Sequence, residues 1–303
     1  MSSTGAFHEG ELLVQRRAEL TAEAARLAGM LGPPDLNGAM GRFAAERRLA
    51  LLTSRDGDGR LWTSAVHGPQ GFLRARAATL TVAALPLPGD PLHELQEGEQ
   101  AGLLLVDFDR RRRLRVNGVL RRVDGDGFEV AVDQAFGNCP KYIQQRQIRE
   151  TAAVAEARPT VTRHRELDPA HVAQVRRADT FVLGTAHPTR GADTSHRGGA
   201  AGFVRVERDG LWWPDYPGNN MFNSLGNIAA NPVAALLFLD FGSGTSLQVS
   251  GPARLDWTPR GVGGDDGGTG RRVHVRPERV VHTAGLPMRL LAHQPYAGNP
   301  VLT

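Results

Sequence analysis

The stretch DTSHRGGAAGFVRV, residues 193–206, decides the fold because it repeats an earlier stretch, WTSAVHGPQGFLRA, at residues 62–75. Each stretch is followed by two further segments, and these also resemble their counterparts in the other half of the chain. PGDPLHEL (88–95) precedes AGLLLVDFDRRRRLRVNGVLRRVD (101–124), and PGNNMFNSLGNI (217–228) precedes AALLFLDFGSGTSLQVSGPARLDW (234–257). A repeat of this length indicates two copies of one structural unit in one chain.

The offsets between the copies are steady. Thr63 to Thr194 and Gly71 to Gly202 are both 131 residues apart, whereas Asp107 to Asp240 and Gly118 to Gly251 are both 133 apart. A net insertion of two residues in the second copy accounts for the difference. The repeat therefore predicts an equivalent residue for most positions of each copy.

Each copy is predicted to be mostly antiparallel β-structure. Segments such as LALLTS and GLLLVDF are short and apolar and are bounded by Gly, Pro, Asp or Asn, a pattern typical of strands joined by tight turns. One short helix is expected between the third and fourth strands, at Leu92 to Gln96 and at Ser224 to Ala229, the second ended by Asn231-Pro232. We therefore predict a mainly β protein with some α-helix, built as two fused split β-barrels that form a pseudo-dimer.

The domain boundaries follow from the repeat. Residues 1–38 form an N-terminal helical segment, residues 39–157 the first barrel and residues 158–303 the second. In the first segment an apolar stripe predicts one amphipathic helix that ends at Gly32-Pro33-Pro34. We interpret this helix as a lid on the barrel. The stripe consists of Leu13, Leu20, Ala24, Leu27 and Leu31. Glu150 to Ala157, before the second copy, is also expected to be helical.

Composition limits the class of protein. With 303 residues, 41% hydrophobic and 22% charged, the chain resembles an ordinary globular protein, and apolar runs such as AALLFL are too short to span a bilayer. The first residues lack the pattern of a secretory signal, so we expect a cytoplasmic protein. The single cysteine, Cys139, excludes an internal disulfide and a thiolate metal cluster.

The basic residues do not indicate nucleic-acid binding. The net charge is +4, the arginines are scattered, and Lys141 is the sole lysine. The run at residues 110–113 with Arg115 is interpreted as a solvated strand edge or an interface. Because the histidines show no HExxH spacing or similar pattern, we predict no metal site.

The first candidate site segment is Ser195-His196-Arg197, followed by paired glycines. Copy one has Ser64-Ala65-Val66 in the equivalent place, so the arginine and the paired glycines belong to copy two alone. A hydroxyl, a guanidinium and exposed backbone N–H groups suit a phosphate monoester, which an arginine can bind through two parallel hydrogen bonds. The segment therefore predicts a phosphate site in copy two.

A second segment, PDYPGNN at residues 214–220, runs into the predicted short helix that carries Ser224. A helix N-terminus offers free N–H donors and attracts phosphate. The alternative is that these residues only form a turn and a helix cap. We take as candidate cofactor-binding residues Asp215, Tyr216, Asn219, Asn220 and Ser224.

Two further features are candidates for contact with a cofactor ring. Gln248, where copy one has Arg115, can both donate and accept at a ring edge. GNCPKYIQQR, residues 137–146, gathers Asn138, Lys141 and Tyr142, and copy two replaces it with an unrelated sequence. Lys141 either places positive charge near the ring or is a surface lysine. Cys139, which has no evident His and Asn partners, is interpreted as inert.

These residues resemble the pyridoxamine 5'-phosphate oxidase-like superfamily of FMN-binding split barrels, and in particular its long two-copy bacterial branch. The likeness covers the whole chain and includes FHEGELLVQ, FGNCPKYIQQR, TAHPTRGADTSHRGGAAGFVRV and DYPGNNMFNSLGNIAANPVAALLFLDF. In the oxidases, a Ser-x-Arg segment and a Ser-Arg-Lys segment hold the FMN phosphate, and a Gln-Val pair contacts the flavin ring. The resemblance implies these roles for Ser195-His196-Arg197, for Phe222-Asn223-Ser224 and for Gln248-Val249.

The resemblance also departs from the oxidases. Asn223 and Ser224 stand where the oxidases have Arg and Lys, and the C-terminal substrate-binding residues have no clear counterpart, so pyridoxamine phosphate is not implied as the substrate. The flavin is expected in the seam between the copies, where GNCPKYIQQR would approach the phosphate site of copy two. The sequence leaves the catalytic residues open.

The implied function is an FMN-dependent oxidoreductase that acts on a small molecule. The alternatives are a non-catalytic flavin-binding protein, a barrel that has lost its cofactor, or a split barrel that uses deazaflavin F420 or haem. A separate flavin reductase or electron donor is a candidate partner, whereas nucleic acid and membranes are not expected. The chain is expected to be a monomeric pseudo-dimer or a homodimer.

Overall fold

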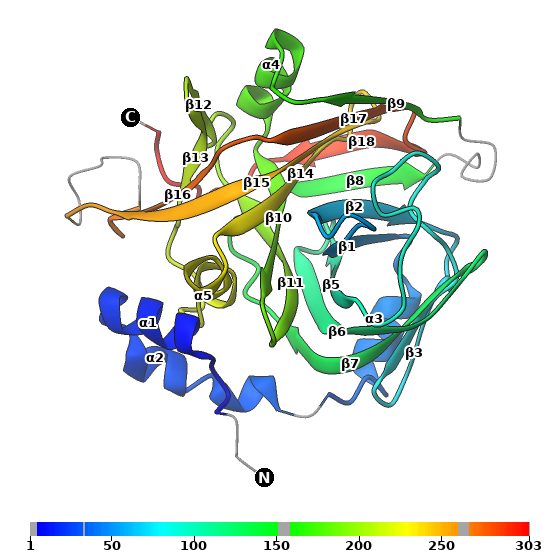
Figure 1. The fold of residues 1–303 in the computed structure, drawn as a ribbon, viewed down its shortest axis with the longest axis horizontal. Helices are drawn as coiled ribbons and strands as arrows, with labels where there is room; N and C mark the ends of the chain where they lie inside the picture. The colour runs from blue at the N-terminus through cyan, green and yellow to red at the C-terminus, as the bar shows by residue number, and fades with distance from the viewer. Residues whose placement is uncertain (1–4, 33, 151–157, 260–266, 303) are drawn as a thin grey trace.

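The computed structural model describes residues 5–32, 34–150, 158–259 and 267–302. Two large antiparallel sheets dominate it, and each curls into a split barrel (Figure 1). The first sheet has the order β2-β1-β5-β6-β7-β4-β3, and the core of the second has the order β11-β10-β14-β15-β16-β13-β12. The prediction of two fused split β-barrels is confirmed.

The strands of the first barrel are β1 (Leu49–Arg55), β2 (Leu61–His67), β3 (Leu73–Arg76), β4 (Thr79–Val82), β5 (Gln100–Asp107), β6 (Arg112–Asp124) and β7 (Gly127–Gly137). Those of the second are β10 (Thr180–His187), β11 (Gly191–Gly198), β12 (Arg205–Glu207), β13 (Gly210–Pro214), β14 (Val233–Asp240), β15 (Thr245–Trp257) and β16 (Arg271–Val275). β17 (Arg279–Ala284) and β9 (Thr160–His164) extend the second sheet beside β15. β8 (Gln145–Glu150) pairs with β18 (Met288–Gln294).

The strand registers confirm the equivalences that the repeat predicts. Thr63 pairs with Thr53 in the first barrel, and Thr194 pairs with Gly184 in the second. Gly71 and Gly202 have nearly equal positive φ angles, 88° and 89°. Glycine adopts such angles readily, which explains its presence at this turn in both copies.

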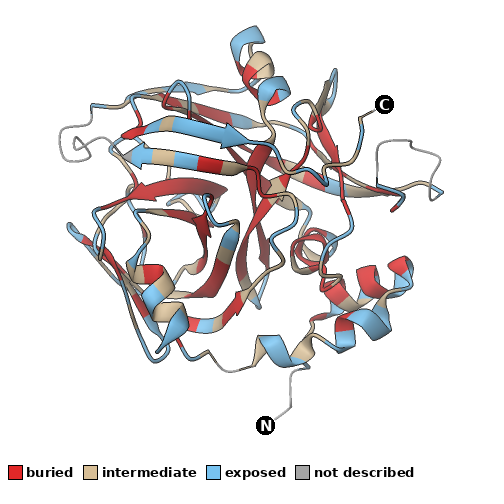
Figure 2. Ribbon diagram, turned by 180° about the vertical axis from the view of Figure 1, so that it is seen from behind, coloured by how far each residue is buried: buried red, intermediate tan, exposed pale blue. Residues whose placement is uncertain are grey.

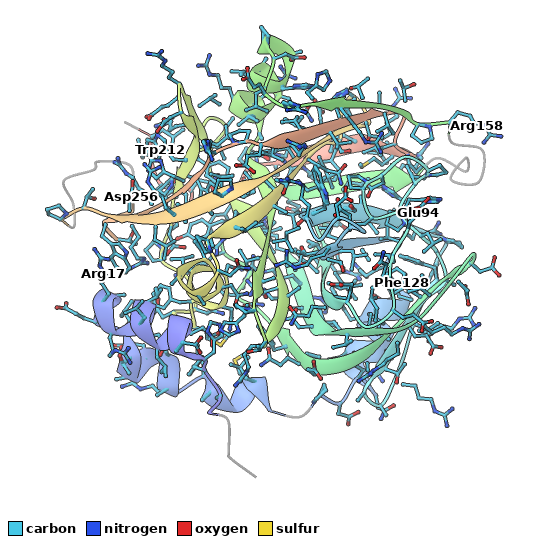
Figure 3. The ribbon with its side chains drawn as sticks, viewed as in Figure 1. Arg17, Glu94, Phe128, Arg158, Trp212 and Asp256 are labelled. Atoms are coloured by element: carbon cyan, nitrogen blue, oxygen red, sulfur yellow. The ribbon has the colours of Figure 1, made fainter. Side chains whose placement is uncertain are left out.

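Apolar side chains fill both barrels and the seam between them. Phe128, labelled in Figure 3, is 2% exposed and belongs to the core of the first barrel, while Trp213 is fully buried in the second. A separate apolar cluster joins residues of both copies, among them Leu104 and Leu237. In Figure 2, seen from behind, most strands of the two barrels are buried along much of their length, while the N-terminal helices have exposed as well as buried residues. No helix of the described residues is long and apolar enough to cross a bilayer.

At the centre of the seam, threonine hydroxyls from the two copies meet. Thr53 Oγ1 lies 2.9 Å from Thr63 Oγ1 and accepts a 2.7 Å hydrogen bond from Thr194 Oγ1. Gly184 faces this cluster, and a Cβ there would lie 2.2 Å from Thr63 Oγ1. The lack of a side chain at Gly184 therefore allows the two barrels to approach this closely.

The N-terminal segment differs from the prediction of one amphipathic helix. It forms α1 (Glu9–Ala18), α2 (Thr21–Ala25) and a 3-10 helix (Ala28–Leu31), with α3 (Ala39–Ala45) following. The continuous helix is interrupted because Glu19 caps α1 in the left-handed conformation, with φ 59°. The predicted stripe is wrong in α1, where Leu13 is 52% exposed whereas Val14 and Ala18 are buried, but Ala24 of the stripe is buried.

The predicted short helix is present in copy two as α5 (Asn223–Ala230) but not in copy one. There the Asp90 carboxylate accepts the Leu92 N–H at 2.8 Å and the Asp90 carbonyl accepts the His93 N–H at 3.0 Å, which makes a turn. The prediction of a helix from Glu150 to Ala157 is wrong for Glu150, which is the last residue of β8. Residues 151–157 lie outside the described residues. The remaining helix is α4 (Pro169–Arg177). The predicted division into three segments stays a prediction.

Candidate functional site

The candidate site lies where β11 of copy two runs beside β5 and β6 of copy one (Figure 1). Arg115 of β6 crosses the seam. Its Nη1 donates to the Asp193 carboxylate at 3.0 and 3.3 Å, and its Nη2 donates to Ser195 Oγ at 2.5 Å. Ser224 Oγ, at the start of α5, donates to the same carboxylate at 2.8 Å. Copy one therefore supplies a buried cation to the strand that carries the candidate phosphate residues.

A second carboxylate, Asp215, holds two further arginines. Arg197 Nη1 donates to Asp215 Oδ1 at 3.1 Å, and Arg271 Nε donates to Asp215 Oδ2 at 2.9 Å. Arg271 is 4% exposed and lies over the Phe222 ring, 5.1 Å from its centroid. Both guanidinium groups are thus fixed in position beside the N-terminus of α5.

These residues line two adjoining cavities, together called the seam cavity, with volumes of about 80 and 50 Å³. The cavities share Arg115, Arg197, Tyr216, Gly218 and Asn219. The first also contains the predicted residues Asn138, Lys141, Tyr142, Ser195 and His196, and the second Asp215, Asn220 and Ser224. Of the predicted cofactor-binding residues, all except Gln248 are therefore brought together. Their contact with a cofactor stays a prediction.

The seam cavity carries more positive than negative charge. Arg113, Arg115, Arg197 and Arg271 line it, as does Lys141 at an exposed edge, whereas the acidic residues beside it are Asp193 and Asp215. Burial, together with repulsion from Arg115 and Arg197, lowers the pKa of Arg113 to about 9. Such crowding of like charge is costly unless an anion compensates for it.

The buried polar atoms left without a partner are mostly donors. Within the part of the chain that the structure describes, Arg113 Nε, Arg197 Nε, Asn138 Nδ2 and His196 Nε2 have no hydrogen-bond partner. Arg113 Nη1 lies 3.2 Å from His196 Nδ1, so Nδ1 accepts and the proton of the neutral ring is on Nε2. Buried donors are almost always paired in folded proteins, so the cavity fits a ligand rich in acceptor oxygens.

Burial and the surrounding arginines keep His196 neutral. The pKa of His196 lies well below its usual value, first because the ring is buried and then because Arg113 and Arg146 are close. The imidazole can therefore offer a neutral N–H donor at physiological pH and carries no charge that a ligand would have to balance.

The GNCPKYIQQR segment approaches the copy-two cluster, as the sequence predicts. Asn219 Nδ2 donates to Asn138 Oδ1 at 2.8 Å, and the Tyr142 hydroxyl donates to the Pro217 carbonyl at 3.0 Å. The Tyr142 and Tyr216 rings lie 5.3 Å apart, and burial raises the pKa of Tyr142 to about 12. The site is therefore composite, with contributions from both copies.

Gln248 does not lie with the other predicted residues, and its contact with a cofactor stays a prediction. Gln248 Nε2 donates to Ser64 Oγ at 2.9 Å and to Asp90 Oδ2 at 3.1 Å, both in copy one. Gln248 and Arg115 occupy equivalent strand positions, because Gln248 pairs with Leu237 as Arg115 pairs with Leu104. The side chain of each of these two residues contacts the opposite copy. Burial raises the pKa of Asp90 to about 6. The equivalent seam of copy one thus has an amide and an acid where the seam cavity has arginines.

Three of the arginines that line the seam cavity are not among the residues predicted for the site. Arg113 and Arg115 belong to the run interpreted as a solvated strand edge or an interface, and no motif includes Arg271. One signal was available for Arg115, because its equivalence to Gln248 was known and a two-fold seam places this strand against the opposite copy. Arg271, near a glycine-rich stretch, gave no such signal.

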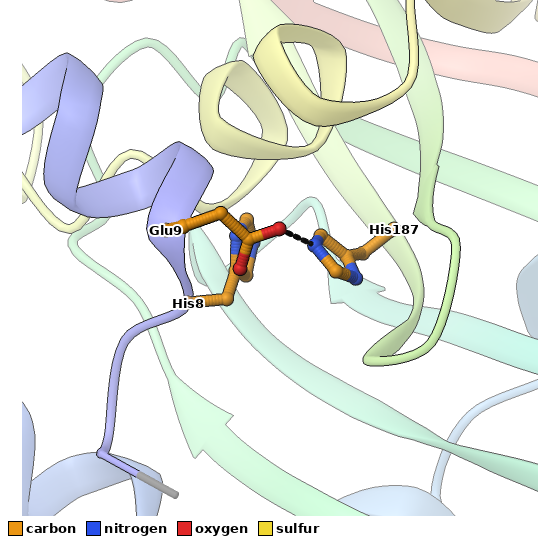
Figure 4. Close-up of side chains that lie close together, drawn as sticks. All are labelled: His8, Glu9 and His187. Atoms are coloured by element: carbon orange, nitrogen blue, oxygen red, sulfur yellow. Dashed lines mark hydrogen bonds and ion pairs between the residues drawn. The ribbon is translucent and has the colours of Figure 1, made fainter.

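The N-terminal helix supports α5 from outside the cavity. Figure 4 shows Glu9 of α1 accepting a 2.8 Å hydrogen bond from His187 Nε2, with His8 beside them. His8 Nε2 lies 3.0 Å from Asn227 Oδ1 on α5, and burial followed by repulsion from His187 lowers the pKa of His8 to about 4. The backbone N–H groups of Gly10 and Thr189 donate to Nδ1 of His8 and His187. With both ring nitrogens occupied, this cluster fits a hydrogen-bonded clamp, and the absence of a metal site stays a prediction.

Comparison with known proteins bears on the second barrel. Residues 167–260 match the family model described as pyridoxamine 5'-phosphate oxidase, and this range contains β11 and α5. The match supports the likeness of this part of the chain to the pyridoxamine 5'-phosphate oxidase-like superfamily. A search of curated proteins found no match.

Solved structures with similarity to the chain include three small proteins. HutZ, a haem storage protein from Vibrio cholerae, is 12% identical, with a TM-score of 0.31 and coverage of 40% of this chain and 96% of its own. An FAD-binding protein from Mesorhizobium loti is 14% identical, with a TM-score of 0.29 and coverage of 42% and 98%. An F420 reductase is 16% identical, with a TM-score of 0.26 and coverage of 42% and 98%.

Proposed function

We propose that the chain binds one FMN, with its phosphate in the seam cavity, and is an FMN-dependent oxidoreductase that acts on a small molecule. The observation that carries this proposal is the set of unpartnered buried donors beside fixed arginines, Arg113, Asn138, His196 and Arg197. A phosphate monoester has acceptor oxygens and negative charge and so complements both. The superfamily that the second barrel resembles supplies the flavin as the phosphate-bearing group.

Arg197 and Arg271 would hold the phosphate together with Ser224 and Asn223 at the start of α5. Both guanidinium groups are already oriented by Asp215, so little side-chain entropy is lost when the ligand binds. The α5 N-terminus adds backbone N–H donors. These groups would take over the role of the Arg and Lys that the oxidases have in the places of Asn223 and Ser224.

The ring would contact residues of the seam. His196 and Asn138 offer neutral donors to its polar edge, and Tyr142 offers an aromatic face. A bound flavin supplies the electron-transfer chemistry, while the chain binds and orients it.

The absorption spectrum of the purified protein, followed by acid release of the cofactor, tests the proposal. We expect a flavin spectrum and one FMN per chain, because the equivalent seam of copy one has Ser64, Asp90 and Gln248 in place of arginines. A haem or deazaflavin spectrum, or no binding of added FMN, would refute it. Two FMN per chain would show that the copy-one seam also binds.

Arg197→Ala is expected to weaken FMN binding tenfold to a hundredfold. The variant loses a charge-assisted contact worth roughly 1.5–3 kcal/mol, whereas Arg271 and the α5 N-terminus remain. Riboflavin, which lacks the phosphate, should bind the variant and the wild type alike. Titration followed by flavin fluorescence measures both, with Arg122→Ala on an exposed part of β6 as the control. Equal losses for FMN and riboflavin would make Arg197 a structural residue.

Lys141→Met is expected to lower the reduction potential of bound flavin by tens of millivolts. Lys141 lines the seam cavity at an exposed position, and removal of a nearby positive charge disfavours added electrons. Lys141→Arg keeps the charge and should keep the potential. Equilibration with reference dyes gives the potentials. Unchanged potential and affinity in Lys141→Met would assign Lys141 to the surface.

A further inference from the structure

A larger groove adjoins the seam cavity on the copy-one side. Met40 and Phe43 of α3 form one wall, residues 110–113 form another, and Leu114 and Pro140 contribute apolar surface. We call it the arginine groove. Its volume is about 470 Å³, within the range of small-molecule sites. Arg113 and Asn138 line both the groove and the seam cavity, so the two are neighbours.

The charge of the arginine groove is one-sided. Four consecutive arginines line it, and none of the described residues that line it is acidic. Asp107 is close, but it pairs with Arg47 at 2.9 Å and lies 3.8 Å from Arg110. The charge of Arg111, Arg112 and Arg113 is therefore not balanced by Asp107.

Two of these arginines contact aromatic rings. Arg112 lies over the Phe43 ring, 5.2 Å from its centroid, and Arg111 lies over the Tyr296 ring at 5.6 Å. Buried Nε atoms of Arg111 and Arg113 have no hydrogen-bond partner among the described residues.

We propose that the arginine groove binds the substrate, and that this substrate is an anion with an apolar body, such as an aromatic carboxylate or sulfonate. The proposal rests on the proposed function, because the seam cavity next to the groove would hold the flavin phosphate. Guanidinium groups pair with a carboxylate through parallel hydrogen bonds. Phe43, Met40, Leu114 and Pro140 give the apolar body a surface on which burial is favourable.

Binding of 2-naphthoate and of its neutral analogue 2-naphthalenemethanol tests the proposal. Calorimetric titrations are made on FMN-loaded and FMN-free protein, in the wild type and in the double variant Arg111→Gln/Arg112→Gln. Arg122→Gln is the matched control, since Arg122 is on the same strand but outside the groove. We expect naphthoate to bind the wild type at least tenfold more tightly than the alcohol, and the double variant to lose that preference while its FMN affinity stays within twofold.

The outcomes separate this proposal from the proposed function. Equal binding of acid and alcohol, or unchanged naphthoate binding in the double variant, would refute the arginine groove as an anion site. Competition between naphthoate and FMN would also refute it, because the groove would then belong to the cofactor. Naphthoate binding that depends on both arginines in a protein with no FMN affinity would keep the anion site and refute the flavin.

Discussion

Arg115→Met is expected to destabilise the chain by about 3–5 kcal/mol, because it leaves a buried carboxylate without its cation. Arg115 is 7% exposed and Asp193 is 3% exposed, and each lies on a different barrel. Methionine retains much of the apolar volume of the arginine, so the loss comes mainly from charge. Urea unfolding measures the change.

A matched set of variants isolates the ion pair. Arg122→Met removes an exposed arginine from the same strand, where the partner is Asp124 at the surface, and should cost less than about 1 kcal/mol. The double variant Arg115→Met/Asp193→Asn removes both charges and should recover much of the stability. A loss below about 1 kcal/mol in Arg115→Met would show that this pair does not hold the seam together.

Gly226→Ala is expected to destabilise the protein by roughly 1–3 kcal/mol or more, the usual cost of overpacking. A Cβ at this position of α5 would lie 2.6 Å from the Glu11 backbone nitrogen and 2.7 Å from its Cα. Helix α1 would therefore have to move away from α5. The hydrogen bond from Asn223 to the Glu11 carboxylate and the one from Gln15 to the Met221 carbonyl would then break. The sign is diagnostic, because Gly→Ala in a free helix stabilises by up to about 1 kcal/mol.

Gly29→Ala is the control for this variant. Gly29 lies in the N-terminal segment, as α1 does, and a Cβ at Gly29 would have no atom within 4 Å. Its effect should stay within about 0.5 kcal/mol. Because Asn223 and Ser224 begin α5, FMN affinity should also fall in Gly226→Ala. A Gly226→Ala protein as stable as Gly29→Ala would mean that α1 is not packed on α5 in solution.

The repeat made the architecture predictable, whereas the site was only partly so. Constant offsets fixed which strands are equivalent, and the registers at Thr63 and Thr194 confirm them. The offsets do not say which copy a side chain faces. Gln248 was therefore grouped with the copy-two residues although it contacts copy one, and Arg115, which contacts copy two, was not grouped with them.

Local patterns were weaker guides than the repeat. The spacing of Leu13, Leu20 and Leu27 favoured one long helix, but a left-handed cap at Glu19 ends it, and the close approach of Gly10 to Gly226 selects a different face. The turn at Asp90 likewise replaces a predicted helix because a side chain captures the backbone N–H of Leu92. Single side-chain hydrogen bonds of this kind leave little trace in hydrophobic periodicity.

The two copies have different residues at one equivalent strand position, Arg115 in the first and Gln248 in the second, and this difference has an evolutionary consequence. In a homodimer a single codon specifies this strand position at both seams, so any substitution appears twice and both sites change together. Here two codons specify it. Selection could therefore keep an arginine facing Ser195 while an amide came to face Ser64, without any compromise between the two. Fusion of the copies thus allows one seam to specialise while the other is free to serve the stability of the chain.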